Sequence, residues 1–472
     1  MSDPTSPAPG LVREMRLWDV ILFNIAAVLG PRWVASAAHI GPSSLTLWVL
    51  ATLFFFLPSA WTITELATRY PAEGGLYVWA REAFGPFHGF IAGWTYWIYS
   101  IIYFPALLNA SVAMATYLGG PRTAALAQHR GYIMAASLLM LALALGFNLV
   151  GVRIGKWLEN AGGIGTYLPL VMLVCVGVAY VHRFGLATPF SWSALVIRLD
   201  WGTLNYWAQI AFAFSGLELV CMMSEEIHEP ERVLPRSILI SAVLIAAIYL
   251  LGTAATLGVL RPENVDVRTG AIQALTAASG FFGLGWIAIV TAVVLTVGNI
   301  GGVGTTVAGV ARVPFAVGID RYLPPAFASI HPRWKTPWVA MLVQAGLAAV
   351  LLVVSQLGET VAGAYQILVD ATTIMYFIPF LYMFGALIGL RHRPDRGRGA
   401  HHSLVPGGQV GIWLMGVIGG VVTLGAIILS AIPPSDVVAK GWFEVKVLGG
   451  CVVLVTAGLG LYWRRQRAER ST

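Results

Sequence analysis

Residues 209–235 read QIAFAFSGLELVCMMSEEIHEPERVLP, and this stretch decides how the rest of the chain is interpreted. It begins as an apolar helix, is interrupted at Phe214-Ser215-Gly216-Leu217-Glu218 and ends in an acidic loop with two prolines. A carboxylate such as that of Glu218 is costly inside a membrane, so it usually faces a cavity or a partner and has a function. Gly216 weakens the helix, and non-helical backbone at membrane depth persists only where it lines a cavity. The stretch therefore predicts half of a substrate site within a membrane.

The composition places the chain among helical membrane proteins. Of its 472 residues, 57% are hydrophobic and only 11% are charged, and the mean hydropathy is +0.76. Soluble globular chains carry about 25% charged residues. The formal net charge of +7 does not indicate nucleic-acid binding, because Lys and Arg concentrate in loops on one side, as membrane topology requires. We expect a multi-pass protein of the cell (inner or plasma) membrane with both termini in the cytoplasm.

Hydropathy predicts an all-α protein with about twelve transmembrane helices. The expected spans are 17–38, 44–67, 84–102 running on towards 118, 131–150, 158–181, 202–223, 234–259, 282–310, 337–356, 364–390, 410–431 and 445–463.

The first span contains a second interruption. Gly30-Pro31 lies in mid-span and is followed at once by Arg32. Proline lacks an N–H group and clashes with the preceding turn, so a break or kink is expected here. A broken helix exposes N–H groups that bind carboxylates and carbonyls that bind ammonium groups. Breaks at corresponding places in two halves, here the first and sixth spans, are typical of inverted-repeat transporters. The alternative interpretation is that each break is an ordinary proline or glycine kink.

Four motifs, in this order and at this spacing, resemble the amino acid–polyamine–organocation transporter superfamily over nearly the whole chain. They are Pro71-Ala-Glu-Gly-Gly-Leu-Tyr77 with Ala83-Phe-Gly85; Phe212-Ala-Phe-Ser-Gly-Leu-Glu218 with Glu225-Glu226, Pro230, Arg232 and Pro235; Ala311-Arg-Val-Pro-Phe-Ala-Val-Gly-Ile-Asp320 with Leu323-Pro324; and His331-Pro332 with Thr336-Pro337.

The resemblance implies a five-plus-five inverted repeat with discontinuous helices 1 and 6, followed by two C-terminal helices. The corresponding boundaries are a cytoplasmic tail at 1–14, a first repeat at 15–185, a second repeat at 195–392, two further helices at 405–465 and a second cytoplasmic tail at 466–472. It also implies import or exchange of amino acids or related amines, by a monomer or homodimer surrounded by lipid.

The resemblance assigns the first-span break to substrate binding. In the family this break reads Gly-Ser/Thr-Gly, and its amides hold the substrate carboxylate; here Gly30, Pro31 and Arg32 stand in those positions, after Val28 and Leu29. Pro31 removes one amide donor. Arg32 either binds the carboxylate through its guanidinium, pairs with an acid such as Glu218, or extends to the membrane edge.

The resemblance assigns the other half of the substrate site to the break in the sixth span. Phe212 matches an aromatic residue that closes over the substrate, and the backbone from Phe214 through Ser215 and Gly216 to Leu217 would receive ammonium or other polar groups. Glu218 matches a proton-sensing residue of a related arginine/agmatine exchanger. Ordinary packing of Phe212 and a structural hydrogen-bonding role of Glu218 are the alternatives.

The coupling ion is left open between H⁺ and Na⁺, and we expect no other cofactor. Many sodium-independent members of the family carry a lysine in the fifth span, where this chain has Thr166. The stretch Gly163-Ile-Gly-Thr-Tyr-Leu-Pro169 is more similar to the glutamate/GABA exchanger branch of the family. Thr305 and Thr306 in the eighth span are candidate Na⁺ ligands, although threonines in membrane helices usually bond their own backbone. Further polar or aromatic candidates at depth are Asn299 and Trp97 for substrate, and Asp370 for protons.

These observations predict a secondary transporter of amino acids or related amines that works by alternating access, by proton coupling or exchange. Sodium symport is the alternative mechanism, and a non-transporting membrane sensor on the same scaffold is the alternative class. The sequence has no set of catalytic acids, metal ligands or nucleotide-binding residues in its spans, so we expect neither an enzyme nor a metal site.

Overall fold

The computed structural model describes residues 13–70, 74–197, 201–319, 322–355, 361–393, 404–433 and 440–470. Most of the two predicted tails, residues 71–73 of the first motif and Asp320 of the third lie outside these residues. Within the described part, ten helices are long and apolar enough to cross a membrane, and a bent pair formed by α1 and α2 brings this number to eleven. A further broken segment, α10 followed by a 3₁₀ helix, supplies the twelfth expected span.

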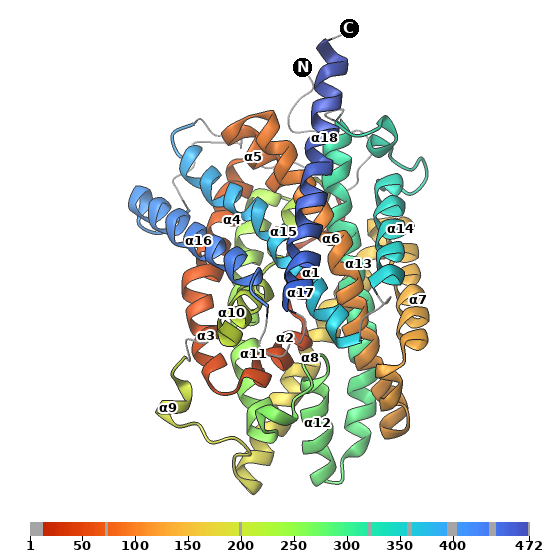
Figure 1. Ribbon diagram of the computed structural model, residues 1–472, viewed down its shortest axis with the longest axis vertical. Coiled ribbons are helices and arrows are strands. Elements are labelled where there is room, and N and C mark those ends of the chain that lie inside the picture. The colour runs from red at the N-terminus through yellow and green to blue at the C-terminus, as the bar shows by residue number, and fades with distance from the viewer. Residues whose placement is uncertain are drawn as a thin grey trace.

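The helices follow the predicted spans closely, and Figure 1 shows them as one bundle. Their bounds are α1 Leu17–Val28, α2 Pro31–Ile40, α3 Ser43–Ala51, α4 Leu57–Arg69, α5 Leu76–Phe84, α6 Pro86–Ala115, α7 Arg130–Leu149, α8 Val152–Phe184, α9 Trp192–Leu195, α10 Trp201–Ala213, α11 Pro230–Val259, α12 Gly270–Phe281, α13 Gly285–Ile319, α14 Trp338–Ser355, α15 Val361–Gly389, α16 Gly408–Ser430, α17 Lys440–Glu444 and α18 Gly450–Arg470. Two π-helical segments, Thr52–Phe56 and Val445–Gly449, join α3 to α4 and α17 to α18.

The first span is broken where the sequence predicts it. α1 ends at Val28, Leu29 and Gly30 have extended backbone, and α2 begins at Pro31 with a bend of 42°. Proline suits the first position of a helix because its missing N–H group would have no partner there in any case. The break therefore lies at Leu29–Gly30, with Arg32 in the first turn of α2.

The sixth span is broken at Gly216. α10 ends at Ala213, and the chain resumes at the 3₁₀ helix Leu219–Glu226. Gly216 has a φ of +121°, which L side chains rarely adopt, and a Cβ atom added there would lie 3.1 Å from Val28 and 3.2 Å from the carbonyl oxygen of Ala27. The second break thus packs directly against the first.

Close helix contacts support this pair of breaks. α1 packs against α8, α11 and α13, and α8 packs extensively on α13. A Cβ atom at Gly298 of α13 would lie 2.5 Å from the backbone of Gly165 of α8, so this contact requires glycine. Gly301 of α13 makes a similarly close contact with Gly162 of α8, so glycines allow the two helices to approach each other.

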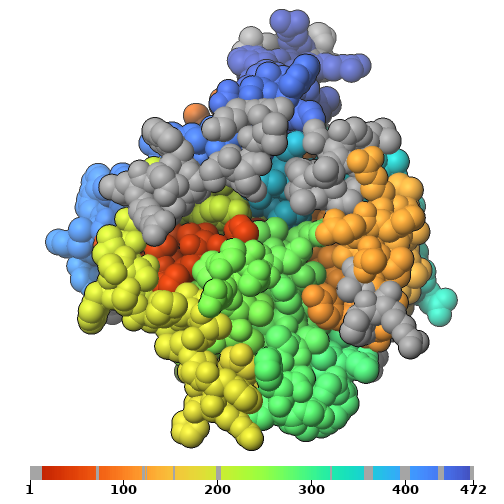
Figure 2. Space-filling model, turned by 60° about the horizontal axis from the view of Figure 1, so that its bottom comes forward, coloured from red at the N-terminus to blue at the C-terminus, as the bar shows by residue number. Residues whose placement is uncertain are grey.

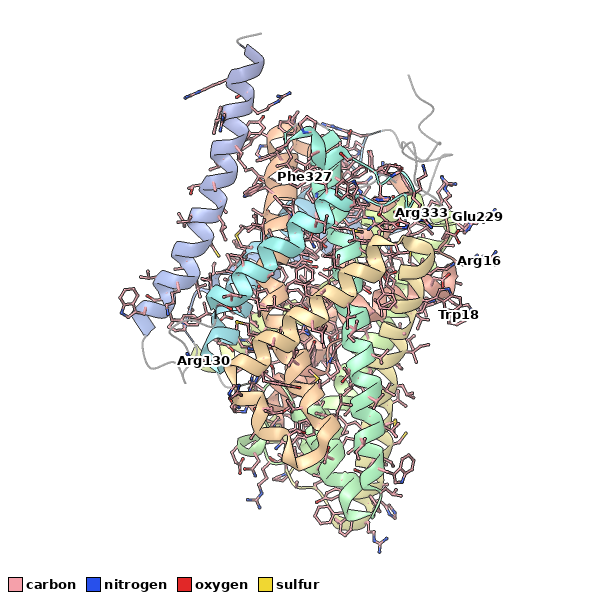
Figure 3. All side chains as sticks on the ribbon, turned by 90° about the vertical axis from the view of Figure 1, so that its right-hand side faces the viewer. Arg16, Trp18, Arg130, Glu229, Phe327 and Arg333 are labelled. Carbon is pink, nitrogen blue, oxygen red and sulfur yellow. The ribbon has the colours of Figure 1, made fainter. Side chains whose placement is uncertain are left out.

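One end of the bundle is tied together by the segment before α1. The N–H group of Glu14 donates to the carbonyl of Glu226 at 2.9 Å, and His228 donates to the carbonyl of Met15 at 2.9 Å. Beside them, Arg312 of α13 donates to both carboxylate oxygens of Glu226 at 2.7 and 2.9 Å, and both side chains are buried. Arg16, Glu229 and Arg333 lie at this end in Figure 3, whereas Arg130 lies towards the other.

The opposite end is formed by α12 and the segments beside it. Seen from that end in Figure 2, the red α2–α3 corner is visible between the yellow chain around residue 190 and the green chain around residue 270. Arg268, just before α12, is buried there and donates to Asn109 of α6 at 3.2 Å.

Candidate functional site

Two adjoining cavities lie at the helix breaks, one beside the first break and one between the two breaks. Their empty volumes are ≈ 320 and ≈ 340 Å³, and they share a wall made of Ala27, Val28, Tyr103 and Thr306. The first, which we call the arginine cavity, is further lined by Ala26, Leu29, Gly30, Arg32, Leu107, Thr166, Asn299 and Gly302. The second, which we call the aromatic cavity, is further lined by Trp33, Tyr99, Phe212, Ser215, Gly216, Leu219 and Tyr376.

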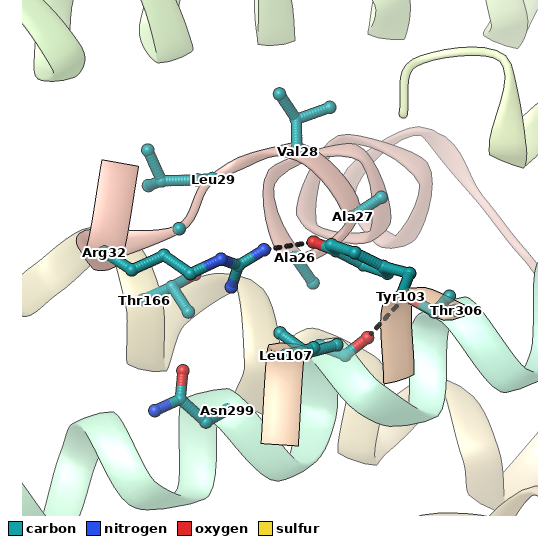
Figure 4. A pocket seen from close by; sticks show the side chains of 12 residues that line it. Ala26, Ala27, Val28, Leu29, Arg32, Tyr103, Leu107, Thr166, Asn299 and Thr306 are labelled. Carbon is teal, nitrogen blue, oxygen red and sulfur yellow. Dashed lines mark hydrogen bonds between the residues drawn. The ribbon is translucent and has the colours of Figure 1, made fainter. Parts of the chain in front are cut away.

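Arg32 supplies the charge of the arginine cavity. Figure 4 shows its guanidinium extended across the cavity towards Tyr103, with Thr166 and Asn299 nearby. One guanidinium nitrogen donates to the hydroxyl of Tyr103, and the group stacks over the ring of Trp33 at 4.6 Å. Arg32 is only 4% exposed, its Nε has no hydrogen-bond partner, and it forms no ion pair among the described residues. A buried guanidinium in this state favours an anionic ligand.

The alternative that pairs Arg32 with Glu218 disagrees with the structure, because the carboxylate of Glu218 is hydrogen-bonded to Tyr96, Tyr376 and Gly216. Extension of Arg32 to the membrane edge is also excluded by its burial. Of the three alternatives, only a role facing the cavity agrees with the geometry.

The main-chain groups of the first break are largely occupied. Gly30 donates its N–H to the hydroxyl of Tyr249 at 3.1 Å, and Pro31 has no N–H to offer. The same hydroxyl lies 2.7 Å from the carbonyl oxygen of Val28 and 3.1 Å from that of Ala213 at the end of α10. Tyr249 of α11 therefore joins the two breaks, and the side chain of Arg32 is left as the principal anion-binding group.

Aromatic rings surround the second cavity. Phe212 makes edge contacts with Trp33, Tyr103 and Tyr376, with ring centroids 5.6, 5.8 and 5.3 Å apart. Tyr99 contacts Tyr376 at 4.6 Å. The electron-rich faces of such rings attract ammonium groups, and the chain between α10 and the 3₁₀ helix forms one wall of this cavity.

Glu218 lies behind the aromatic cavity in a closed hydrogen-bond network. Its Oε1 accepts from the hydroxyls of Tyr96 at 2.6 Å and Tyr376 at 2.5 Å, and its Oε2 accepts from the N–H of Gly216 at 3.1 Å. The side chain is completely buried. Because Tyr376 also lines the cavity, a change at Glu218 is transmitted to the site through one shared side chain.

The predicted eighth-span residues divide between the cavities and the helix itself. Thr306 and Asn299 line the arginine cavity, whereas Thr305 does not. Both threonine hydroxyls donate to carbonyls of their own helix, Thr305 to Gly301 at 3.0 Å and Thr306 to Gly302 at 3.1 Å. This is the usual arrangement of threonine in a membrane helix.

Several residues expected at the site lie away from both cavities. Trp97 packs against Trp94 and Phe327, and Phe214 packs against Trp48, Phe56 and Tyr249. Pro31 lines a separate small cavity beside Pro169. Asp370 accepts from Gln366 at 3.2 Å, and neither it nor Leu217 lines either cavity. These residues therefore belong to the packing around the site and do not line either cavity.

Sequence reasoning missed Trp33, Tyr103, Tyr249 and Tyr376. Tyr103 was detectable, because Tyr96, Tyr99 and Tyr103 recur at spacings of three and four residues and so share one face of α6. Trp97 falls off that face. Tyr249 had no local signal, since two of its partners, Val28 and Gly30, lie more than 200 residues away, and the third, Ala213, lies on another helix.

A helical membrane bundle with interrupted first and sixth spans beside a central cavity defines the class of secondary transporters. The chain belongs to the amino acid permease family, whose model matches residues 15–456, within the amino acid–polyamine–organocation superfamily. The structure of MhsT in complex with L-phenylalanine has the same fold, with a TM-score of 0.65 and 14% identity over 89% of this chain and 99% of that one. The resemblance found in the sequence is confirmed.

Several proteins similar to this chain are transporters. An uncharacterized transporter of Legionella pneumophila is 29% identical over 94% of this chain and 95% of its own. The serine/threonine exchanger SteT of Bacillus subtilis is 26% identical over 81% and 84%. The probable agmatine/putrescine antiporter AguD of Lactococcus lactis is 23% identical over 80% of each chain. The chain is thus a multi-pass membrane transporter for an amino acid or amine.

Proposed function

We propose that this protein transports a carboxylate-bearing amino acid by alternating access and that Arg32 binds the carboxylate. The observation that carries the proposal is the buried guanidinium of Arg32, which faces a cavity beside the first break and has no carboxylate partner among the described residues. An intramembrane charge of this kind is costly unless a ligand or partner compensates it. The occupied N–H of Gly30 supports the same assignment, since the main chain offers little else to a carboxylate.

The charge of the cavities also favours amino acids over diamines. Arg32 is the charged side chain among the described residues that line them. A substrate with two cationic groups, such as the agmatine or putrescine for which the probable antiporter AguD is named, would be repelled by it. The serine/threonine exchanger SteT is therefore the better model for the substrate class of this chain.

Proton coupling or exchange is the mechanism that we favour. A proton on Glu218 would convert one accepting oxygen into a donor and so displace the hydroxyl of Tyr96 or Tyr376. Because Tyr376 lines the aromatic cavity, this step would loosen the wall of the site. Sodium symport is less favoured, since Thr306 shares the arginine cavity with a guanidinium that repels Na⁺.

We place both termini in the cytoplasm. Arg16 and Arg333 lie at the end of the bundle that the segment before α1 ties together. Positive residues favour the cytoplasmic side. In this arrangement the ion pair between Glu226 and Arg312 closes the cytoplasmic route to the cavities.

Uptake by sealed vesicles tests the proposal. The purified chain is reconstituted into liposomes, and uptake of labelled amino acids is compared with uptake of putrescine. We expect saturable amino-acid uptake that Arg32→Ala abolishes at low substrate concentration and Arg32→Lys partly retains. Binding of an amino acid without uptake would instead support the sensor alternative, and uptake unaffected by Arg32→Ala would remove the proposed carboxylate site.

A further inference from the structure

We infer that the preferred substrate is a zwitterion in which one or more additional methylene groups separate the ammonium from the carboxylate, as in a β- or γ-amino acid. This inference rests on the proposed function, because it takes Arg32 as the carboxylate-binding group. It goes further by assigning the two ends of the substrate to two different cavities.

The junction of the two breaks is the first observation. In a site made from half-helix ends, main-chain N–H groups bind a carboxylate and nearby carbonyls bind the ammonium beside it, which suits the adjacent charges of an α-amino acid. Here the hydroxyl of Tyr249 accepts from Gly30 and lies within hydrogen-bond distance of the carbonyls of Val28 and Ala213. It is completely buried and stacked on Trp48, with ring centroids 4.5 Å apart. The hydroxyl of Tyr249 thus occupies the N–H of Gly30, which would bind a carboxylate at the junction, and it donates its single proton to one of the two carbonyls.

The position of the remaining anion-binding group is the second observation. Arg32 points into the arginine cavity, towards Thr166 of α8 and Asn299 of α13. A carboxylate bound there is displaced from the junction towards α8 and α13. The displacement lengthens the path from the carboxylate to any group held by the second break.

The aromatic cavity provides the other end. It adjoins the arginine cavity through the shared wall of Ala27, Val28, Tyr103 and Thr306. Its rings, among them Phe212, Tyr99 and Tyr376, form a surface that attracts an ammonium group. The carboxylate of Glu218 lies directly behind Tyr376 and adds negative potential. Neither cavity has a second cationic side chain among the described residues, so a second carboxylate has no binding group there.

Tyr249 is accordingly a specificity-determining residue. Removal of its hydroxyl in Tyr249→Phe frees the N–H of Gly30 and the carbonyl of Val28, which restores main-chain groups for adjacent charges. Tyr382→Phe is a matched control, because this half-buried tyrosine contacts His88 and lies on the outer part of α15.

Binding of isomer pairs to the purified full-length protein tests the inference. The pairs are L-alanine with β-alanine and L-2-aminobutyrate with 4-aminobutyrate, so the members of each pair have the same atoms and net charge. We expect the isomer with separated charges to bind about tenfold more tightly, the effect of one well-made charged hydrogen bond. Tyr249→Phe should reduce this preference by a similar factor, whereas Tyr382→Phe should leave it unchanged.

The outcomes separate this inference from the proposed function. If the α-isomers bind as tightly or more tightly and binding still requires Arg32, the inference is wrong and the proposed function stands. The same holds if neither isomer binds but another amino acid shows Arg32-dependent uptake. If Arg32→Ala leaves the binding of every amino acid unchanged, the proposed function itself fails. Should Tyr249→Phe fail to fold, the isomer preference of the wild-type protein decides the matter.

Discussion

The two helix breaks each carry an ionisable side chain, and the two side chains differ in how far the protein satisfies their hydrogen bonds. At the second break Glu218 receives three hydrogen bonds, from Tyr96, Tyr376 and Gly216. At the first break Arg32 has one hydrogen bond, to Tyr103, and faces a cavity with Nε unpartnered. A buried charge that the protein satisfies internally serves the structure or its movement, whereas one left unsatisfied beside a cavity serves a ligand. The difference supports the proposal that the first break binds the substrate and the second acts in gating.

The largest expected effect is that of Arg32→Ala on transport. Loss of a buried charged hydrogen-bond partner should raise KM about 100-fold, equivalent to about 2.7 kcal/mol. Arg32→Lys should retain part of the affinity, because it keeps the charge but not the bidentate geometry. Initial rates of uptake over a range of substrate concentrations measure both effects. Equal KM values for Arg32→Ala and the wild-type protein would contradict the assignment of the first break.

The next largest effect is on the free energy of unfolding, when the backbone of each break is changed by a substitution. Gly216→Ala should lower the free energy of unfolding by about 2 kcal/mol, since the left-handed φ of +121° is strained for alanine and its Cβ meets Val28. Pro31→Ala should change it by less than about 1 kcal/mol, because position 31 has ordinary helical geometry. Denaturant unfolding of the detergent-solubilised variants measures the pair. Similar losses in both variants would show that the second break is no more constrained than the first.

A smaller effect, of a few-fold, is expected from changing Glu218. Glu218→Gln removes the titratable group and should flatten the pH dependence of uptake, while the Arg32-dependent KM stays near its wild-type value. Tyr376→Phe should weaken the dependence without removing it, because Tyr96 and Gly216 still bond the carboxylate. Uptake rates across a pH series measure these changes. A wild-type pH profile in Glu218→Gln would exclude a proton role for the second break.

The smallest effect is expected from sodium. Replacement of Na⁺ by choline should leave uptake unchanged, since the guanidinium of Arg32 shares its cavity with Thr306. Thr306→Val should alter KM only slightly, because the hydroxyl donates to its own helix. A strict requirement for Na⁺ that Thr306→Val abolishes would support sodium symport. It would also contradict the argument that Arg32 repels Na⁺ from the first break.

The two breaks were predictable because their causes are local. Pro31 ends one helix through its own covalent structure, and Gly216 tolerates a conformation closed to other residues. The direction of Arg32 was not predictable, because a long side chain settles according to Trp33 and Tyr103, of which Tyr103 lies on another helix. The role of Tyr249 could not be predicted from the sequence either, since it joins two breaks that only folding brings together. Trp97 was misplaced because an aromatic run does not show which helix face points inward.

The central claim is that the guanidinium of Arg32 contacts the carboxylate of the substrate. The most direct measurement is a binding cycle, in which the amino acid with the lowest Kd and its uncharged carboxamide are each titrated by calorimetry against the wild-type protein and Arg32→Gln. The account predicts that the wild-type protein prefers the acid to the amide by about 100-fold and that Arg32→Gln loses nearly all of this preference. An equal preference for the acid in both proteins would contradict it.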